Sequence, residues 1–71
     1  METLNAKIYI SNGQIVVEGA EGNQVWLYDA VGRMIATKQE DFAPIRFNIS
    51  ASGIYLVKVG HYPARRVVVI R

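Results

Sequence analysis

Short apolar stretches alternate with turn residues along the whole chain, at intervals of about ten residues, the spacing typical of sandwiches and barrels. No segment repeats its apolar residues with a helical period. The stretches between turns are rich in Val, Ile, Tyr and Phe, which suit the pleated, half-buried surface of a strand. The pattern predicts strands over residues 6–11, 14–18, 24–29, 33–39, 44–49, 54–60 and 64–70.

Two hairpin turns are indicated by their residues. Asn12 and Gly13 separate the first two stretches, and this pair suits a type I′ turn because both central residues need a positive φ. Asp29 begins the second turn, where its side chain can cap the backbone and Gly32 can supply the left-handed residue. Both turns predict that the flanking strands are antiparallel neighbours.

Apolar and polar residues alternate in several of these strands, which predicts one buried face for each of them. In segment 44–49, for example, Arg46 and Asn48 are expected to face solvent. The residues expected to point into the core are Ile8, Ile10, Ile15, Val17, Ile45, Phe47 and Ile49.

Segments 24–29, 54–60 and 64–70 break this alternation and carry apolar side chains on both faces. If they are neighbours, one sheet is apolar on both sides. Scattered surface residues explain such a pattern, and so does a docking face for a partner or a neighbouring domain; both interpretations stay open. The residues of this candidate docking face are Trp26, Tyr28, Ile54 and Leu56.

Segment 48–55 passes from a strand, through a small polar turn, to Tyr55 just inside the next strand. This layout resembles the tyrosine corner of immunoglobulin-like sandwiches, in which the phenol hydroxyl bonds to upstream backbone. Together with seven expected strands, it predicts an all-β, immunoglobulin-like Greek-key β-sandwich rather than an SH3-like or OB barrel.

Size and composition indicate one domain, residues 1–71, without covalent support. The chain has no cysteine, so disulfides are excluded, and its stability must come from apolar packing, consistent with 51% hydrophobic residues. The net charge of +2 provides only weak steering toward nucleic acid.

No catalytic or metal site is expected. A nucleophilic site needs a base beside its nucleophile, and the single histidine, His61, lies in an expected tight turn and is interpreted as solvated. Glu40 and Asp41 supply too few oxygens for calcium, which takes about 6–8. The glycines of segment 19–23 precede no helix, so they do not form a phosphate-binding loop. We therefore expect no enzyme activity, no metal and no cofactor.

Basic residues gather towards the end of the sequence, at Lys58, Arg65, Arg66 and Arg71. Beside aromatic residues, such a cluster can bind single-stranded nucleic acid. A charged strand edge also keeps a sheet from pairing with other chains. The second interpretation is preferred because acidic residues offset the field, and no nucleic-acid partner is expected.

Three segments resemble, in order, parts of the C-terminal sorting domains of the type IX secretion (Por secretion) system. Residues 25–35 read VWLYDAVGRMI and are similar to the family's "v-x-v-y-d-x-x-G-R" segment. Residues 53–59, GIYLVKV, are similar to its "G-i-Y-l-v-k-v" strand, and residues 65–70, RRVVVI, resemble its closing strand.

The resemblance implies a seven-stranded immunoglobulin-like domain at the end of a longer protein exported by Bacteroidetes-type bacteria. Such domains are recognised by the outer-membrane secretion machinery once the cargo is in the periplasm. A surface sortase commonly removes them and couples the cargo to lipopolysaccharide. The expected location is therefore the periplasm in transit, then the cell surface or the medium, and the expected partners are the secretion machinery, the sortase and an upstream domain.

One departure from the family keeps a second hypothesis open. Family members usually begin with a "y-P-N-P" segment, and residues 8–13 stand there without proline. The alternative is a structural or adhesive immunoglobulin-like module of a surface protein, without an export role.

Under the sorting hypothesis, recognition occurs by docking of an exposed strand, in which backbone hydrogen bonds supply much of the affinity. Gly32 and Arg33 are expected to shape their hairpin rather than to touch a receptor. The residues expected to be recognised are Gly53, Tyr55, Val57, Lys58, Arg65, Arg66, Val67, Val68, Val69, Ile70 and Arg71.

Overall fold

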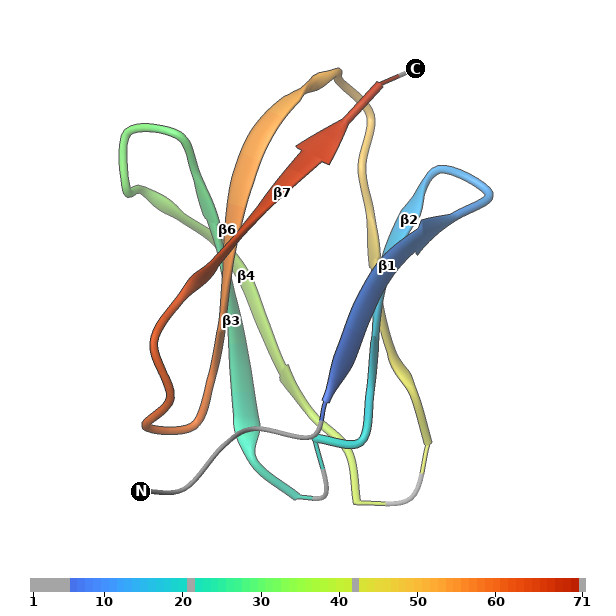
Figure 1. The fold of residues 1–71 in the computed structure, drawn as a ribbon, viewed down its shortest axis with the longest axis vertical. Helices are drawn as coiled ribbons and strands as arrows, with labels where there is room; N and C mark the ends of the chain where they lie inside the picture. The colour runs from blue at the N-terminus through green and yellow to red at the C-terminus, as the bar shows by residue number, and fades with distance from the viewer. Residues whose placement is uncertain (1–5, 21, 42, 71) are drawn as a thin grey trace.

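Two antiparallel sheets face each other in the computed structural model, which describes residues 6–20, 22–41 and 43–70 (Figure 1). One sheet has the strand order β1-β2-β5 and the other the order β4-β3-β6-β7. The strands are β1 (Lys7–Ser11), β2 (Gln14–Glu18), β3 (Gln24–Asp29), β4 (Met34–Gln39), β5 (Ile45–Asn48), β6 (Gly53–Val59) and β7 (Arg65–Val69). No helix long and apolar enough to cross a membrane occurs in these residues.

The strand order makes this an immunoglobulin-like Greek-key sandwich. The chain passes from one sheet to the other after β2, after β4 and after β5, so β2 pairs with β5 and β3 pairs with β6. Each expected strand forms, with ends that differ from the expectation by no more than one residue at either side. The predicted fold class is confirmed.

The core lies between the two sheets and is built from alternate residues of the central strands. Ile15 and Val17 of β2, and Ile45 and Phe47 of β5, point inward as the alternation predicts. From the opposite sheet, the core receives Val25, Leu27, Val57, Val59 and Val69. Complete burial of such side chains stabilises a fold by about 1.5–3 kcal/mol each, which replaces covalent support here.

Two residues depart from the expected alternation. Ile10 is 41% exposed, because it lies next to the β1–β2 turn, which extends away from the other sheet (Figure 1). Val16 faces outward yet is 0% exposed. It stands opposite Tyr9 on one side and Arg46 on the other, and these long neighbours cover it. The expectation that Ile10 belongs to the core is therefore wrong.

Both hairpin turns have the expected geometry. Asn12 and Gly13 have φ angles of 51° and 74°, as a type I′ turn requires. In the β3–β4 turn, the Oδ1 atom of Asp29 accepts hydrogen bonds from the backbone N–H groups of Val31 (3.1 Å) and Arg33 (2.9 Å). Gly32, with φ of 88°, donates its N–H to the Asp29 carbonyl at 3.0 Å.

The tyrosine corner forms where the chain crosses from β5 to β6. The Tyr55 hydroxyl donates to the carbonyl oxygen of Ala51, four residues upstream, at 2.8 Å. This bond ties the start of β6 to the crossover that leaves the three-stranded sheet. The sequence-based expectation for this segment is confirmed.

Replacing Tyr55 with Phe removes this bond and leaves the ring in place. We expect the free energy of unfolding to fall by about 1 kcal/mol, the net value of an ordinary hydrogen bond, in urea denaturation. Tyr28→Phe, on the opposite face of the same sheet, is the matched control because no hydrogen bond is formed by the Tyr28 hydroxyl in the described structure. Equal losses in the two variants would contradict the role of the corner.

The capped β3–β4 turn predicts a pH dependence. Hydrogen bonds from the Arg33 backbone, and then from the Arg33 side chain and the Val31 backbone, lower the pKa of Asp29 below its ordinary value. Because the folded pKa is the lower one, this stabilisation is complete above the ordinary aspartate pKa and is lost as the pH falls through the Asp29 pKa. An NMR titration of the carboxyl carbon should give a depressed midpoint, and Asp29→Asn should lose this part of the acid dependence. An undepressed midpoint would contradict the cap.

Candidate functional site

The outer side of the four-stranded sheet is largely apolar. Strand register aligns Met34, Tyr28, Leu56 and Arg66 in one row across all its strands. Next to this row, Trp26 lies between Thr37 and Lys58. We call the following residues the outer apolar face: Trp26, Tyr28, Met34, Ile54, Leu56 and Val68.

The sequence-based docking face is part of this surface. Strands β3, β6 and β7 are neighbours, so the condition for a sheet that is apolar on both sides is met. Trp26, Tyr28 and Leu56 are half-buried, and Ile54 is exposed. Met34 was not expected here. It joins the face because a register shift between Leu27 and Tyr28 places it opposite Tyr28, and nothing in the sequence marks that shift.

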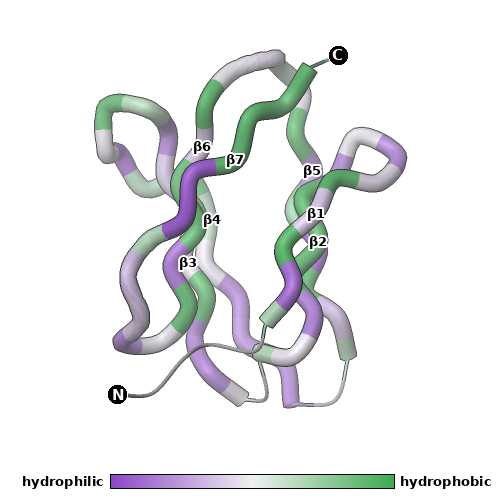
Figure 2. Tube along the Cα trace, viewed as in Figure 1, coloured by the Kyte–Doolittle hydropathy of each residue, from purple (hydrophilic) through white to green (hydrophobic). Residues whose placement is uncertain are grey.

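The residues expected to be recognised divide between the two sides of the same sheet. Val57 and Val69 are buried in the core, and Tyr55 and Val67 pack against it from the inner side. Arg66 and Val68 face outward, and Ile70 is exposed just after β7. Figure 2 shows β7 changing from hydrophilic at its start to hydrophobic towards its end. Gly53 opens β6 beside the Tyr55 ring, and Arg71 lies outside the described residues.

Lys58 is held in place by the turn that follows β6. Its Nζ atom lies 5.8 Å from the centre of the Trp26 ring, within the range of a cation–π contact. The same atom donates to the carbonyl oxygens of Gly60 (3.1 Å) and Tyr62 (3.4 Å). The ammonium group of Lys58 therefore orders the β6–β7 turn.

Two further cations connect the edges of the two sheets. Lys38, on edge strand β4, donates its Nζ to the Arg46 carbonyl of edge strand β5 at 2.6 Å. Arg65, on edge strand β7, donates its Nη1 to the carbonyl of Ala6, just before edge strand β1, at 3.4 Å. Each cation pairs in register with a buried valine, so each lies on the inner side of its strand. Inward-pointing charges of this kind protect sheet edges from pairing with other chains.

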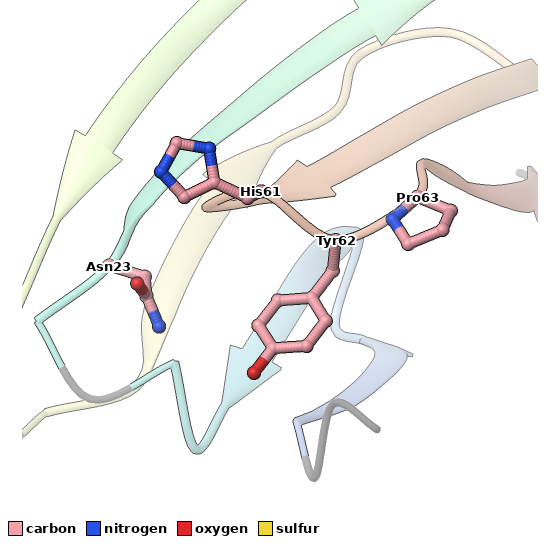
Figure 3. A pocket seen from close by; sticks show the side chains of 4 residues that line it. All are labelled: Asn23, His61, Tyr62 and Pro63. Atoms are coloured by element: carbon pink, nitrogen blue, oxygen red, sulfur yellow. The ribbon is translucent and has the colours of Figure 1, made fainter. Parts of the chain in front are cut away.

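A hollow of about 390 Å³ lies beside the β6–β7 turn, lined by Asn23, His61, Tyr62 and Pro63. Figure 3 shows the imidazole of His61 pointing away from the Tyr62 ring. The Asn23 amide is already engaged, since it donates to the Ala20 carbonyl at 2.8 Å. His61 is exposed in a turn, as expected. Among the described residues, no carboxylate, serine, threonine or cysteine lines this hollow, and its two ionisable side chains, His61 and Tyr62, point apart rather than toward each other.

Metal-ligating side chains do not gather in groups of three or more in the part of the chain that the structure describes. Glu40 and Asp41 are both exposed and lie in the connection after β4.

Comparison with known proteins finds no matching family model, no matching curated protein and no matching solved structure. The likeness to sorting domains therefore rests on the three sequence segments alone. In the structure, these segments cover most of β3, the β3–β4 turn, the start of β4, and strands β6 and β7, all of which belong to the four-stranded sheet.

The opposed orientations of Arg65 and Arg66 predict different effects of the same substitution. Arg65→Met removes the hydrogen bond to the Ala6 carbonyl. The free energy of opening at the start of β1 should fall by about 0.5 kcal/mol, the lower end of the range for a hydrogen bond, because this bond is long. Hydrogen exchange of the β1 amides measures this. Arg66→Met is the matched control and should leave β1 protection unchanged. Equal protection of β1 in both variants would rule out the connection.

Proposed function

We propose that this chain is a sorting domain that directs a larger cargo protein through the outer membrane to the cell surface. In this proposal, its partners are the outer-membrane secretion machinery, a surface sortase and the domain that precedes it in the exported protein. It passes through the periplasm before it reaches the surface or the medium. No catalytic role belongs to it.

The observation that carries the proposal is the place of the three resembling segments on one sheet. β7 is an edge strand, so one of its edges has no partner strand among the described residues. Arg65 opposes pairing at the start of this edge, whereas the part from Val67 to Val69 can accept an extended segment, with the side chains beside it supplying specificity. The outward-facing Arg66 and Val68, with the exposed Ile70, flank that edge. The proposal assigns recognition to these residues and a supporting role to the inward-facing ones.

The second candidate is a structural or adhesive module of a surface protein. It is supported by the outer apolar face, which lies on the same sheet but is centred on β3 and β6 rather than on the edge of β7. In that case the edge of β7 has no part in export.

Export of a fluorescent reporter separates the two candidates. With the reporter fused upstream of the intact chain, in a host that has type IX secretion, we expect the reporter to become accessible to protease added outside the cells. Val68→Asp and Ile70→Asp should reduce surface delivery strongly, because they place charge beside the docking edge. Both side chains are exposed, so the fold should persist, which circular dichroism checks.

Ile10→Asp is the matched control, since Ile10 is 41% exposed and Val68 52%, and both lie on edge strands. It should leave export unchanged. Retention of the reporter in the periplasm with the intact chain would refute the sorting proposal. Such retention would favour the structural module, whereas normal export of the two β7 variants would overturn the assignment of recognition to the edge of β7. Deletion of β7 is a weaker test, because it also removes Val69 from the core.

A further inference from the structure

The two outer surfaces of the sandwich differ in chemistry. On the three-stranded sheet, outward-facing residues satisfy one another: Tyr9 donates to Glu18 at 2.7 Å, and Gln14 donates to Asn48 at 2.8 Å. This surface is therefore polar and suited to contact with solvent. On the four-stranded sheet, the corresponding positions form the outer apolar face, where Met34 is 56% and Val68 is 52% exposed. Polar outward residues occur on this sheet as well, since Gln24 donates to Thr37 at 2.6 Å, but the apolar ones gather beside them in the outer apolar face.

The charged residues beside the outer apolar face are all basic. The outward positions of its strands include Lys58 and Arg66, and none of the described outward positions there holds a carboxylate. Lys58 is occupied by Trp26 and by two carbonyls of the following turn. Arg66 is exposed, and the part of the chain that the structure describes contains no carboxylate within ion-pair distance of it.

Arg66 also has a defined position relative to the apolar residues. It ends the row that begins with Met34 and continues through Tyr28 and Leu56. A partner that covers this row therefore meets three apolar side chains followed by a guanidinium group. Guanidinium binds carboxylate with two parallel hydrogen bonds, which adds both energy and geometric specificity.

From this arrangement we propose that the outer apolar face binds a protein segment in which apolar residues are accompanied by a carboxylate that pairs with Arg66. The inference concerns this face alone and holds whether or not the chain acts in export. A second copy of the chain is a poorer partner, because its own outer apolar face brings no carboxylate from the described residues. A lipid surface is a poorer partner as well, since lipid-binding faces carry clusters of about 4–8 basic residues, whereas the described outward positions of this sheet hold Lys58 and Arg66 alone.

A peptide library provides the probe. Random peptides of about a dozen residues, displayed on phage, are selected on the immobilised chain, a length that covers a strand-sized segment. We expect the enriched peptides to combine apolar or aromatic residues with Asp or Glu. A synthetic enriched peptide should bind in solution, and its NMR shift changes should map to Tyr28, Met34, Leu56 and Arg66.

Arg66→Glu should weaken that peptide by about tenfold or more, because it replaces an attraction with a repulsion. Met34→Ala should weaken it by removal of apolar contact. Lys7→Glu, the same charge reversal on the exposed part of the other sheet, is the control and should change binding less than about twofold. Selection on the Arg66→Glu chain should now enrich Lys or Arg in place of the acidic residue.

Several results would overturn the inference. These are no enrichment at all, enriched peptides without acidic residues, and binding that Arg66→Glu leaves intact. Dimerisation of the chain through this face, measured by sedimentation, would assign it to a second copy. Binding to vesicles of anionic phospholipid that Met34→Ala abolishes would assign it to a lipid surface. Export by the reporter assay is a separate readout, so failure of this inference and failure of the sorting proposal are distinguishable.

Discussion

Packing between the central strand pairs of the two sheets is the interaction on which the rest of the structure depends. β2 and β5 supply Ile15 and Phe47 among others, and β3 and β6 supply Leu27 and Val57. With no disulfide and only 71 residues, this layer holds the sheets together. Because β2 pairs with β5 and β3 with β6, each pair joins strands that are distant in sequence. The same side chains therefore stabilise both sheets and fix the Greek-key order.

The edges of the sandwich follow from that core. A sandwich of seven strands has four edge strands, and a small apolar core cannot cover all of them. Lys38 and Arg65 each cover part of an edge, because the methylene stem lies on the inner side of an edge strand. The charged end of Lys38 reaches a carbonyl of β5, and that of Arg65 reaches the carbonyl of Ala6, just before β1. Charge at these positions also opposes pairing with other chains. The basic character of segment 58–66 thus has a structural explanation in Lys58 and Arg65, which leaves Arg66 as the cation of this segment without a partner in the described structure.

The sequence predicted features that depend on neighbouring residues, and it failed where distant strands decide the outcome. Asn12-Gly13 and the Asp29 cap are local chemistry, and Tyr55 bonds to backbone only four residues away, so each was predictable. Ile10 has the right alternation for the core but lies beyond the area that the other sheet covers. Val16 has the wrong alternation and is buried by residues of two other strands. The area that the facing sheet covers decides the first case, and the strands that pair with β2 decide the second; the local sequence specifies neither.

The candidate site was likewise only partly predictable from the sequence, because the sequence does not show which strands become neighbours. The apolar character of both sides of segments 24–29, 54–60 and 64–70 was visible in the sequence, but whether they share a sheet was a matter of topology. Met34 entered the outer apolar face only through a shift in the β3–β4 register.

The side chains of β7 point alternately into the core and outward, so the strand contributes both to folding and to the outer surface. Val69 belongs to the core, so the strand is needed for folding, while Arg66 and Val68 face outward and take no part in it. A partner that binds these outward side chains therefore contacts a surface that exists only when β7 is paired with β6. Recognition of this strand by its outward side chains would depend on the folded domain, whereas recognition of an extended tail would not. That difference makes substitutions on the outward side, and not truncations, the changes that separate the two modes.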